Sequence, residues 1–135
     1  MGARPKVVID TNVLISAFGW RGKPWEILDL VRRGAIINHS SAALIDELQR
    51  VVTYPKLKFT EEVQADIIEF VLTNSRMVTA SILPDIPIAD RDDLHVIACA
   101  VSAKASFIIS GDPHLLELGC YNGISIHTPS GFLQR

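Results

Sequence analysis

Residues 6–14 read KVVIDTNVL, and the rest of the chain is organised around them. The unbroken β-branched run at 7–9 predicts a short strand that is covered on both faces. This run ends at Asp10, and in an open parallel sheet the carboxyl ends of the strands form the edge where ligands bind. Asp10 is therefore a candidate site residue. The alternative is that it only ends the strand and caps a helix that starts near Val13.

The chain has 135 residues, of which 48% are hydrophobic, and we expect a single domain over residues 1–135. No apolar run approaches the ~18–20 residues that a membrane span needs, and no secretory signal is expected ahead of the first strand. The two cysteines, Cys99 and Cys120, have neither a disulfide-framework spacing nor a metal-binding spacing. These features favour a cytoplasmic protein with no membrane partner.

The net charge of −2 argues weakly against a nucleic-acid partner. If four acidic residues gather in one metal site, however, the remaining surface is slightly basic. Basic residues also cluster locally, at Arg21 with Lys23, at 32–33 and at 50–58, although each cluster alone is read most simply as a solvated face. The composition leaves nucleic acid open without pointing to it.

Predicted strands and helices alternate along the whole chain. The expected strands are 7–9, 35–38, 77–79, 107–110 and 124–126, and the expected helices are 13–18, 24–33, 42–52, 60–74, 90–103, one ending at 118 and a short one from 129. Such alternation is typical of βαβ units, and hence of a parallel sheet with helices on both faces. The predicted fold is α/β: a three-layer α/β/α sandwich around a mostly parallel five-stranded sheet.

Four acidic residues can be argued toward one crevice. Asp10 and Asp112 each follow a short apolar strand, so both face the same edge if the strands are neighbours. Glu47 lies three residues after Leu44 and four before Val51, and therefore within the apolar stripe of its helix.

Asp93 stands three and four residues before Val96 and Ile97 on a later helix, and therefore on the same side as that helix's apolar stripe. A carboxylate turned toward a core costs several kcal/mol unless it is paired or binds a metal. The simpler explanations are a favourable charge at the helix N-terminus for Asp93 and an ion pair with an arginine for Glu47.

The chain has no cysteine–histidine or HExxH spacing, so zinc is disfavoured. An all-oxygen cluster suits Mg²⁺ or Mn²⁺. His114 follows Asp112 closely enough to reach the rim of the crevice, whereas His95 points nearly opposite to Asp93 on its helix. Each histidine is read more simply as a satisfied or surface group.

Three segments in combination resemble the PIN domain, and specifically its branch of toxin components of toxin–antitoxin pairs: VVIDTNVLISA at 7–17, DRDDLHVIACA at 90–100 and ISGDPHLL at 109–116. The resemblance implies a Mg²⁺- or Mn²⁺-dependent ribonuclease with a parallel sheet between helices. It implies a catalytic, metal-binding set of acids and two supporting polar residues, namely Asp10, Glu47, Asp93 and Asp112 with Asn12 and Ser110. Many relatives carry an acid where this chain has His114.

We therefore expect an endoribonuclease that cleaves single-stranded RNA with a metal-activated water and leaves 5′-phosphate and 3′-hydroxyl ends. In this interpretation Asp10 and Asp93 hold the first metal, and basic residues at Arg21, Lys23 and Arg50 follow the RNA strand. The expected protein partner is an antitoxin that inserts an arginine or lysine into the acidic site. A homodimer stays open.

Two other functions are open from the sequence. One is a Mg²⁺-dependent phosphohydrolase acting on a small phosphoester, which would normally need a second acid two residues after the nucleophilic aspartate, where this chain has Asn12. The other is a catalytically weak PIN-like module that acts mainly by binding protein. Incubation with labelled RNA, with and without Mn²⁺, discriminates among the three.

Overall fold

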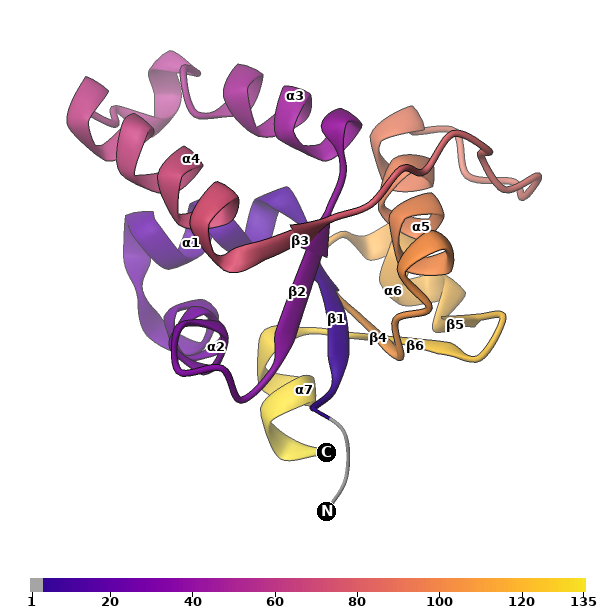
Figure 1. Cartoon of the computed structure of the whole chain (residues 1–135). Coiled ribbons are helices and arrows are strands. Elements are labelled where there is room, and N and C mark those ends of the chain that lie inside the picture. The colour runs from indigo at the N-terminus through magenta and orange to yellow at the C-terminus, as the bar shows by residue number, and fades with distance from the viewer. Residues whose placement is uncertain (1–3) are drawn as a thin grey trace.

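The computed structural model describes residues 4–135, and it places a six-stranded sheet between layers of helices (Figure 1). The strands are β1 Lys6–Ile9, β2 Ile37–Ser40, β3 Ser75–Met77, β4 Phe107–Ile109, β5 Cys120–Tyr121 and β6 Ile124–His127, in the order β3-β2-β1-β4-β6-β5. All neighbouring strands are parallel except β5, which pairs antiparallel with β6. The predicted α/β sandwich is confirmed, with one edge strand more than expected.

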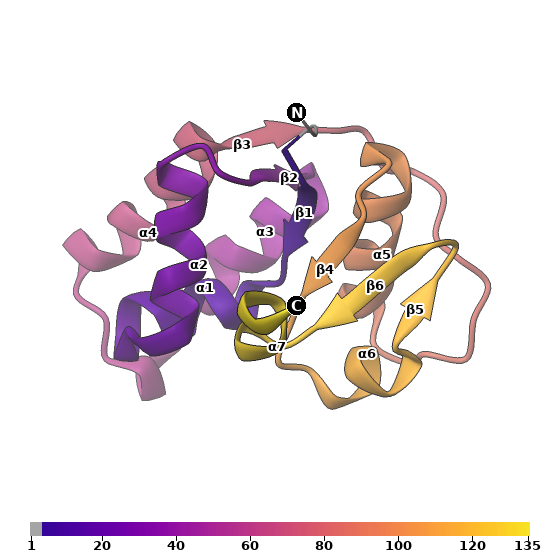
Figure 2. The same cartoon turned by 90° about the horizontal axis from the view of Figure 1, so that it is seen from below.

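The helices are α1 Thr11–Trp20, α2 Gly22–Arg32, α3 Ala42–Val51, α4 Glu61–Asn74, α5 Arg91–Ala103, α6 Pro113–Leu118 and α7 Pro129–Gln134, with a short 3₁₀ turn η1 at Pro55–Leu57. Figure 2 shows α1, α2 and α4 on one side of the strands and α5 and α6 on the other. Within residues 4–135 no helix combines the length and the apolar content that a membrane crossing requires.

Two apolar cores fix β1 at the centre of the fold, because side chains alternate between the faces of a strand. Val7 and Ile9 pack into the core formed with α1, α2 and α4, whereas Val8 packs into the core formed with α5 and α6. All three side chains are fully or almost fully buried. The backbone that leads into Asp10 is therefore held by packing from both sides.

The pairing of β1 near Asp10 differs between its two neighbours. On one side β1 pairs with β4 along its length, and the amide of Asp10 donates to the carbonyl of Ile109 at 2.9 Å. On the other side the amide of Ile9 donates to Oδ1 of Asn38 at 3.0 Å instead of to a backbone carbonyl. The amide group of Asn38 also donates to Oγ of Ser75 at 2.8 Å, so one buried side chain joins β1 to β3.

Element boundaries differ from the sequence predictions by up to two residues, as three examples show. The strand expected at 35–38 is β2 at 37–40, because it continues through polar residues whose backbone pairs with strands on both sides. The strand expected at 77–79 is β3 at 75–77, directly after α4. The helix expected at 13–18 is α1 at 11–20, and it continues through Gly19, where a Cβ would stand 3.4 Å from the ring of Phe59.

Replacing Asn38 with alanine should lower the free energy of unfolding by about 1–3 kcal/mol, because the buried amide of Ile9 loses its acceptor. Asn74→Ala is the matched control, since the Asn74 amide donates to the carbonyl of Phe70 within the same helix and its loss should cost less than about 0.5 kcal/mol. Urea unfolding of both variants measures the difference. Equal effects would show that Asn38 does not bridge the strands.

Candidate active site

A cleft of about 300 Å³ lies at the carboxyl edge of the sheet and is lined by all four predicted acids. They come from four separate elements: Asp10 follows β1, Glu47 lies on α3, Asp93 is in the first turn of α5, and Asp112 precedes α6. Because β1 and β4 are hydrogen-bonded neighbours, the loops that carry Asp10 and Asp112 emerge side by side. The sequence analysis required these two strands to be neighbours if Asp10 and Asp112 were to face the same edge, and in the structure they are.

A chain of hydrogen bonds joins the two loops. Oγ of Ser110 donates to Oδ2 of Asp10 at 2.7 Å and accepts from the amide of Asp112 at 2.9 Å. The amide of Gly111 donates to Oδ1 of Asn12 at 3.2 Å. The two supporting residues named from the sequence, Asn12 and Ser110, therefore tie the loops together and orient the carboxylate of Asp10.

Asp10 also caps the helix that follows it, as the simpler interpretation of the sequence expected. Its Oδ1 accepts from the amide of Thr11 at 2.8 Å, and α1 begins at that residue. The cap engages only one oxygen, while the other points to Ser110. Asp10 therefore both caps α1 and lines the cleft.

Glu47 is held by Thr11, which the sequence prediction did not include among the site residues. Oγ1 of Thr11 donates to Oε1 of Glu47 at 2.7 Å. The arginine that could have neutralised Glu47, Arg50, instead forms its ion pair with Asp92 at 3.0 Å. The sequence signal for Thr11 was its position next to Asp10, but its partner lies 36 residues away and could not be read from spacing.

Asp93 is the acid with the fewest partners. It is only 4% exposed, and its Oδ2 has no hydrogen-bond partner among residues 4–135. No ion pair within the described chain involves Asp10, Glu47 or Asp93. A buried carboxylate oxygen without a donor or a cation is expensive, so this position has the chemistry of a cation ligand.

Burial raises the pKa of Asp10 from 3.8 to about 6, that of Glu47 from 4.5 to about 7 and that of Asp93 from 3.8 to about 7. Neighbouring acids contribute to these raised pKa values after burial, and Asp112 is the acid that acts most strongly on Asp93. The hydrogen bonds from Ser110 and Thr11 lower the pKa of Asp10 and Glu47 in part. The carboxylates therefore share one local field and hold protons more tightly than free acids do.

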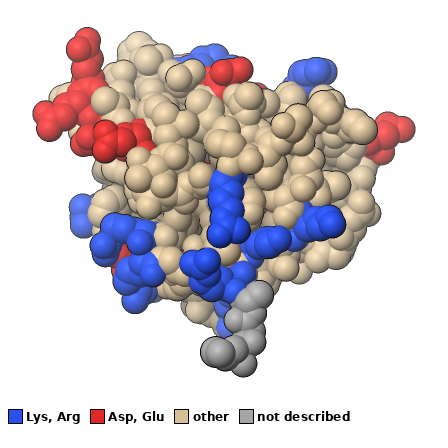
Figure 3. Space-filling view, viewed as in Figure 1, with Lys and Arg blue, Asp and Glu red and all other residues tan. Residues whose placement is uncertain are grey.

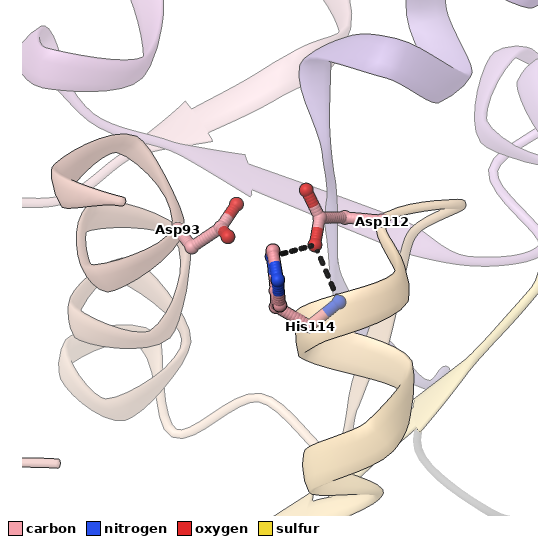
Figure 4. Close-up of side chains that lie close together, drawn as sticks. All are labelled: Asp93, Asp112 and His114. Atoms are coloured by element: carbon pink, nitrogen blue, oxygen red, sulfur yellow. Dashed lines mark hydrogen bonds and ion pairs between the residues drawn. The ribbon is translucent and has the colours of Figure 1, made fainter. Parts of the chain in front are cut away.

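In Figure 4 the side chain of Asp93, on α5, lies opposite those of Asp112 and His114 at the start of α6. Asp93, Asp112 and His114 can each offer one ligand atom such that all three atoms lie within 4.8 Å of one another. Oδ1 of Asp112 accepts from the amides of His114 and Leu115 at 2.8 and 3.3 Å. The set combines two carboxylates and an imidazole, and a divalent cation fits these donors.

A family model described as PIN domain matches residues 6–114. The chain belongs to the PIN domain family. Members of this family are generally nucleases and typically use a divalent metal ion, which agrees with the donors in the cleft.

Two known proteins are similar along most of the chain. The uncharacterized protein MJ1680 of Methanocaldococcus jannaschii is 33% identical over 142 residues, which cover 96% of this chain and 90% of that protein. A chain in the crystal structure of VapBC2 from Rickettsia felis, bound to a DNA fragment from its promoter, shares the fold with a TM-score of 0.63. That match covers 91% of this chain and 98% of the other at 13% identity.

The basic residues named from the sequence lie in different surroundings from the acids of this PIN domain. The guanidinium of Arg21 lies 4.2 Å from the ring centroid of Trp25, and Lys23 pairs with Glu26 at 3.3 Å. Arg50 stands near the cleft through its ion pair with Asp92. RNA contact by Arg21, Lys23 and Arg50 stays a prediction.

The wall of the cleft has three further charged or aromatic residues that the sequence analysis did not name as site residues: Tyr54, Lys56 and Asp90. Other lysines and arginines gather over the lower half of the face in Figure 3. Lys6 is one basic residue far from the cleft, since it begins β1 at the end opposite Asp10. Tyr54 and Lys56 thus provide an aromatic and a basic side chain in the wall of the same cleft as the acids.

Asp93→Asn should make the metal-free PIN domain more stable at pH 8, by on the order of 1 kcal/mol, because it removes one charge from the cluster and keeps the shape of the side chain. Asp92→Asn is the matched control on the same helical turn. It loses the ion pair with Arg50 and should be neutral or slightly destabilising. Urea unfolding in EDTA measures both variants, and a destabilised Asp93→Asn would contradict the repulsion.

The same difference should depend on pH. The raised pKa values of Asp10, Glu47 and Asp93 mean that the folded protein binds more protons than the unfolded chain between about pH 4 and pH 7. Their contribution to stability is therefore fully present below the unfolded pKa and is lost as the pH rises through the folded pKa. His39, whose pKa is lowered by burial, acts in the opposite direction, so the readout is the difference between wild type and Asp93→Asn. The stability advantage of Asp93→Asn over the wild type should grow from pH 5 to pH 8 in EDTA. An advantage that stays constant would refute the raised pKa of Asp93.

Proposed function

We propose that this PIN domain, acting as a single cytoplasmic domain, is a divalent-metal-dependent endoribonuclease for single-stranded RNA and the toxin of a toxin–antitoxin pair. The observation that carries the proposal is the cleft at the ligand edge of the sheet. It holds four acids, of which Asp10, Glu47 and Asp93 form no ion pair among residues 4–135. One buried oxygen, Oδ2 of Asp93, has no hydrogen-bond donor in the same part of the chain. Asp10, Glu47, Asp93 and Asp112 would hold Mg²⁺ or Mn²⁺.

The bound cation supplies Lewis acidity, which lowers the pKa of an attacking water and offsets negative charge on the phosphate. The protein itself positions the carboxylates that would bind the cation. Ser110 fixes the carboxylate of Asp10 relative to the loop of Asp112, and Thr11 fixes Oε1 of Glu47. Because these donors are already in place, the acids need little rearrangement when the substrate binds.

Single-stranded RNA suits the walls of the cleft. Tyr54 is 39% exposed and offers a ring on which a base can stack, while Lys56 beside it offers a positive charge to a phosphate. The pKa of Arg50 is raised first by its hydrogen bond to Tyr54 and then by Asp92, so this cation is held at the same wall. Arg21 and Lys23 would extend the basic path along the strand.

The toxin role is supported by the sequence resemblance and by the fold shared with a chain of the VapBC2 structure. The cleft also suits an inhibitor that carries a cation, since an arginine can pair with two carboxylate oxygens at once. The alternative of a phosphohydrolase for small phosphoesters is disfavoured, because the side chain two residues after Asp10 is Asn12, which is engaged by the amide of Gly111.

RNA cleavage should require Mg²⁺ or Mn²⁺ and should be abolished by Glu47→Gln, whereas Asp46→Asn, the exposed neighbour on the same helix, should keep activity within about twofold. The products should carry 5′-phosphate and 3′-hydroxyl ends, and a 2′-deoxy substitution at the cleaved position should be tolerated, because metal-assisted attack by water does not use the 2′-hydroxyl. Labelled RNA separated on gels and mass spectrometry of the ends measure this. Products with 2′,3′-cyclic phosphate would refute the mechanism.

A partner protein that inhibits the cleavage should place an arginine or lysine in the cleft. Replacing that residue with alanine in the partner should weaken inhibition by tenfold or more, since it leaves the acids without their counter-charge. Replacement of a basic residue outside the contact is the control. If only apolar substitutions in the partner relieve inhibition, the partner binds elsewhere.

A further inference from the structure

His114 lies at the edge of the acidic cleft and offers an imidazole beside the carboxylates of Asp93 and Asp112. It lies one residue beyond the first position of α6, and its Nδ1 is 3.7 Å from Oδ1 of Asp112. It lines a neighbouring hollow that shares Asp90 and Asp112 with the acidic cleft. With a side chain that is 74% exposed, it can turn without disturbing the core.

The contact with Asp112 alone could be an ordinary interaction at a helix start. Such an interaction does not explain the buried and unpartnered carboxylate of Asp93. Asp93 comes from α5 and is only 4% exposed. In Figure 4 its carboxylate points toward Asp112 and His114. Its Oδ2 has no partner among residues 4–135, so the buried carboxylate beside the imidazole keeps an oxygen with nothing to bind.

The three ligand atoms lie within 4.8 Å of one another. Opposite ligands of a single Mg²⁺ are about 4.2 Å apart, twice the usual bond length, so small rotations of exposed His114 bring the three atoms to one cation. Mg²⁺ prefers oxygen ligands and retains its waters, whereas imidazole nitrogen favours first-row transition metals. The donors therefore discriminate between ions that an all-carboxylate site would treat alike.

We propose that Asp93, Asp112 and His114 form a cation site with an imidazole ligand that selects Mn²⁺, or another first-row transition-metal ion, over Mg²⁺. The inference deepens the proposed nuclease function and rests on it. It assigns to His114 the direct coordination of the cation and to Asp93 the buried anchor of the site.

The test is Mn²⁺ binding to the whole protein without RNA, followed by electron paramagnetic resonance. Pulsed spectra of the wild type should show coupling of Mn²⁺ to an imidazole nitrogen, and His114→Ala should lose it. Titrations should show that His114→Ala binds Mn²⁺ at least about tenfold more weakly, while its affinity for Mg²⁺, measured by competition, changes less than twofold. His114→Asp should bind Mg²⁺ as well as or better than the wild type and show no nitrogen coupling.

Two controls locate the nitrogen. His95→Ala, on α5, should keep the coupling, and Asp93→Asn should lose it together with the Mn²⁺. The proposal is overturned if the wild type lacks nitrogen coupling, if the coupling survives in His114→Ala, or if His114→Ala weakens Mn²⁺ and Mg²⁺ equally. Failure of the proposed function gives a different result, namely nitrogen coupling in a protein that binds Mn²⁺ and cleaves no RNA.

Discussion

Repulsion among carboxylates gathered at one edge of the sheet is the constraint on which the site depends. Two unit charges about 4 Å apart repel by roughly 1 kcal/mol in water and by more where water is excluded. Ser110 and Thr11 each donate to one acid, but neither brings a positive charge, and Arg50 pairs with Asp92. Protons or a bound cation relieve the cluster, and burial, together with this repulsion, raises the pKa values of Asp10, Glu47 and Asp93 in the metal-free protein.

The apolar cores are what hold the acids together against this repulsion. Val7 and Ile9 lie in one core and Val8 in the other, so the strand that presents Asp10 cannot move toward either layer without opening a packed interface. Asp93 is held in the same way, because Val96 and Ile97 on its helix are fully buried. Favourable apolar packing elsewhere in the chain thus offsets the unfavourable free energy of the acidic site, as is common at functional sites.

The order of the elements and the positions of the acids could be predicted from the sequence, because both rest on local periodicity. The alternation of apolar runs gave the parallel sheet, and the helical phase of Glu47 and Asp93 placed them on inward faces. Long-range pairing could not be predicted in this way. The bond from Thr11 to Glu47 spans 36 residues, and β5 is an edge strand of two residues whose pairing with β6 leaves no periodic signal.

The measurement that tests a single metal site most directly is the unfolding free energy of the wild type and of Asp10→Asn, in EDTA and in excess Mn²⁺. If the cleft binds the cation in the folded state only, Mn²⁺ at about 100 times its dissociation constant should stabilise the wild type by ~2.7 kcal/mol. Asp10→Asn should gain much less, because the site has lost an anionic ligand. If Mn²⁺ shifts neither protein, or shifts both equally, the acids of the cleft do not form one metal site.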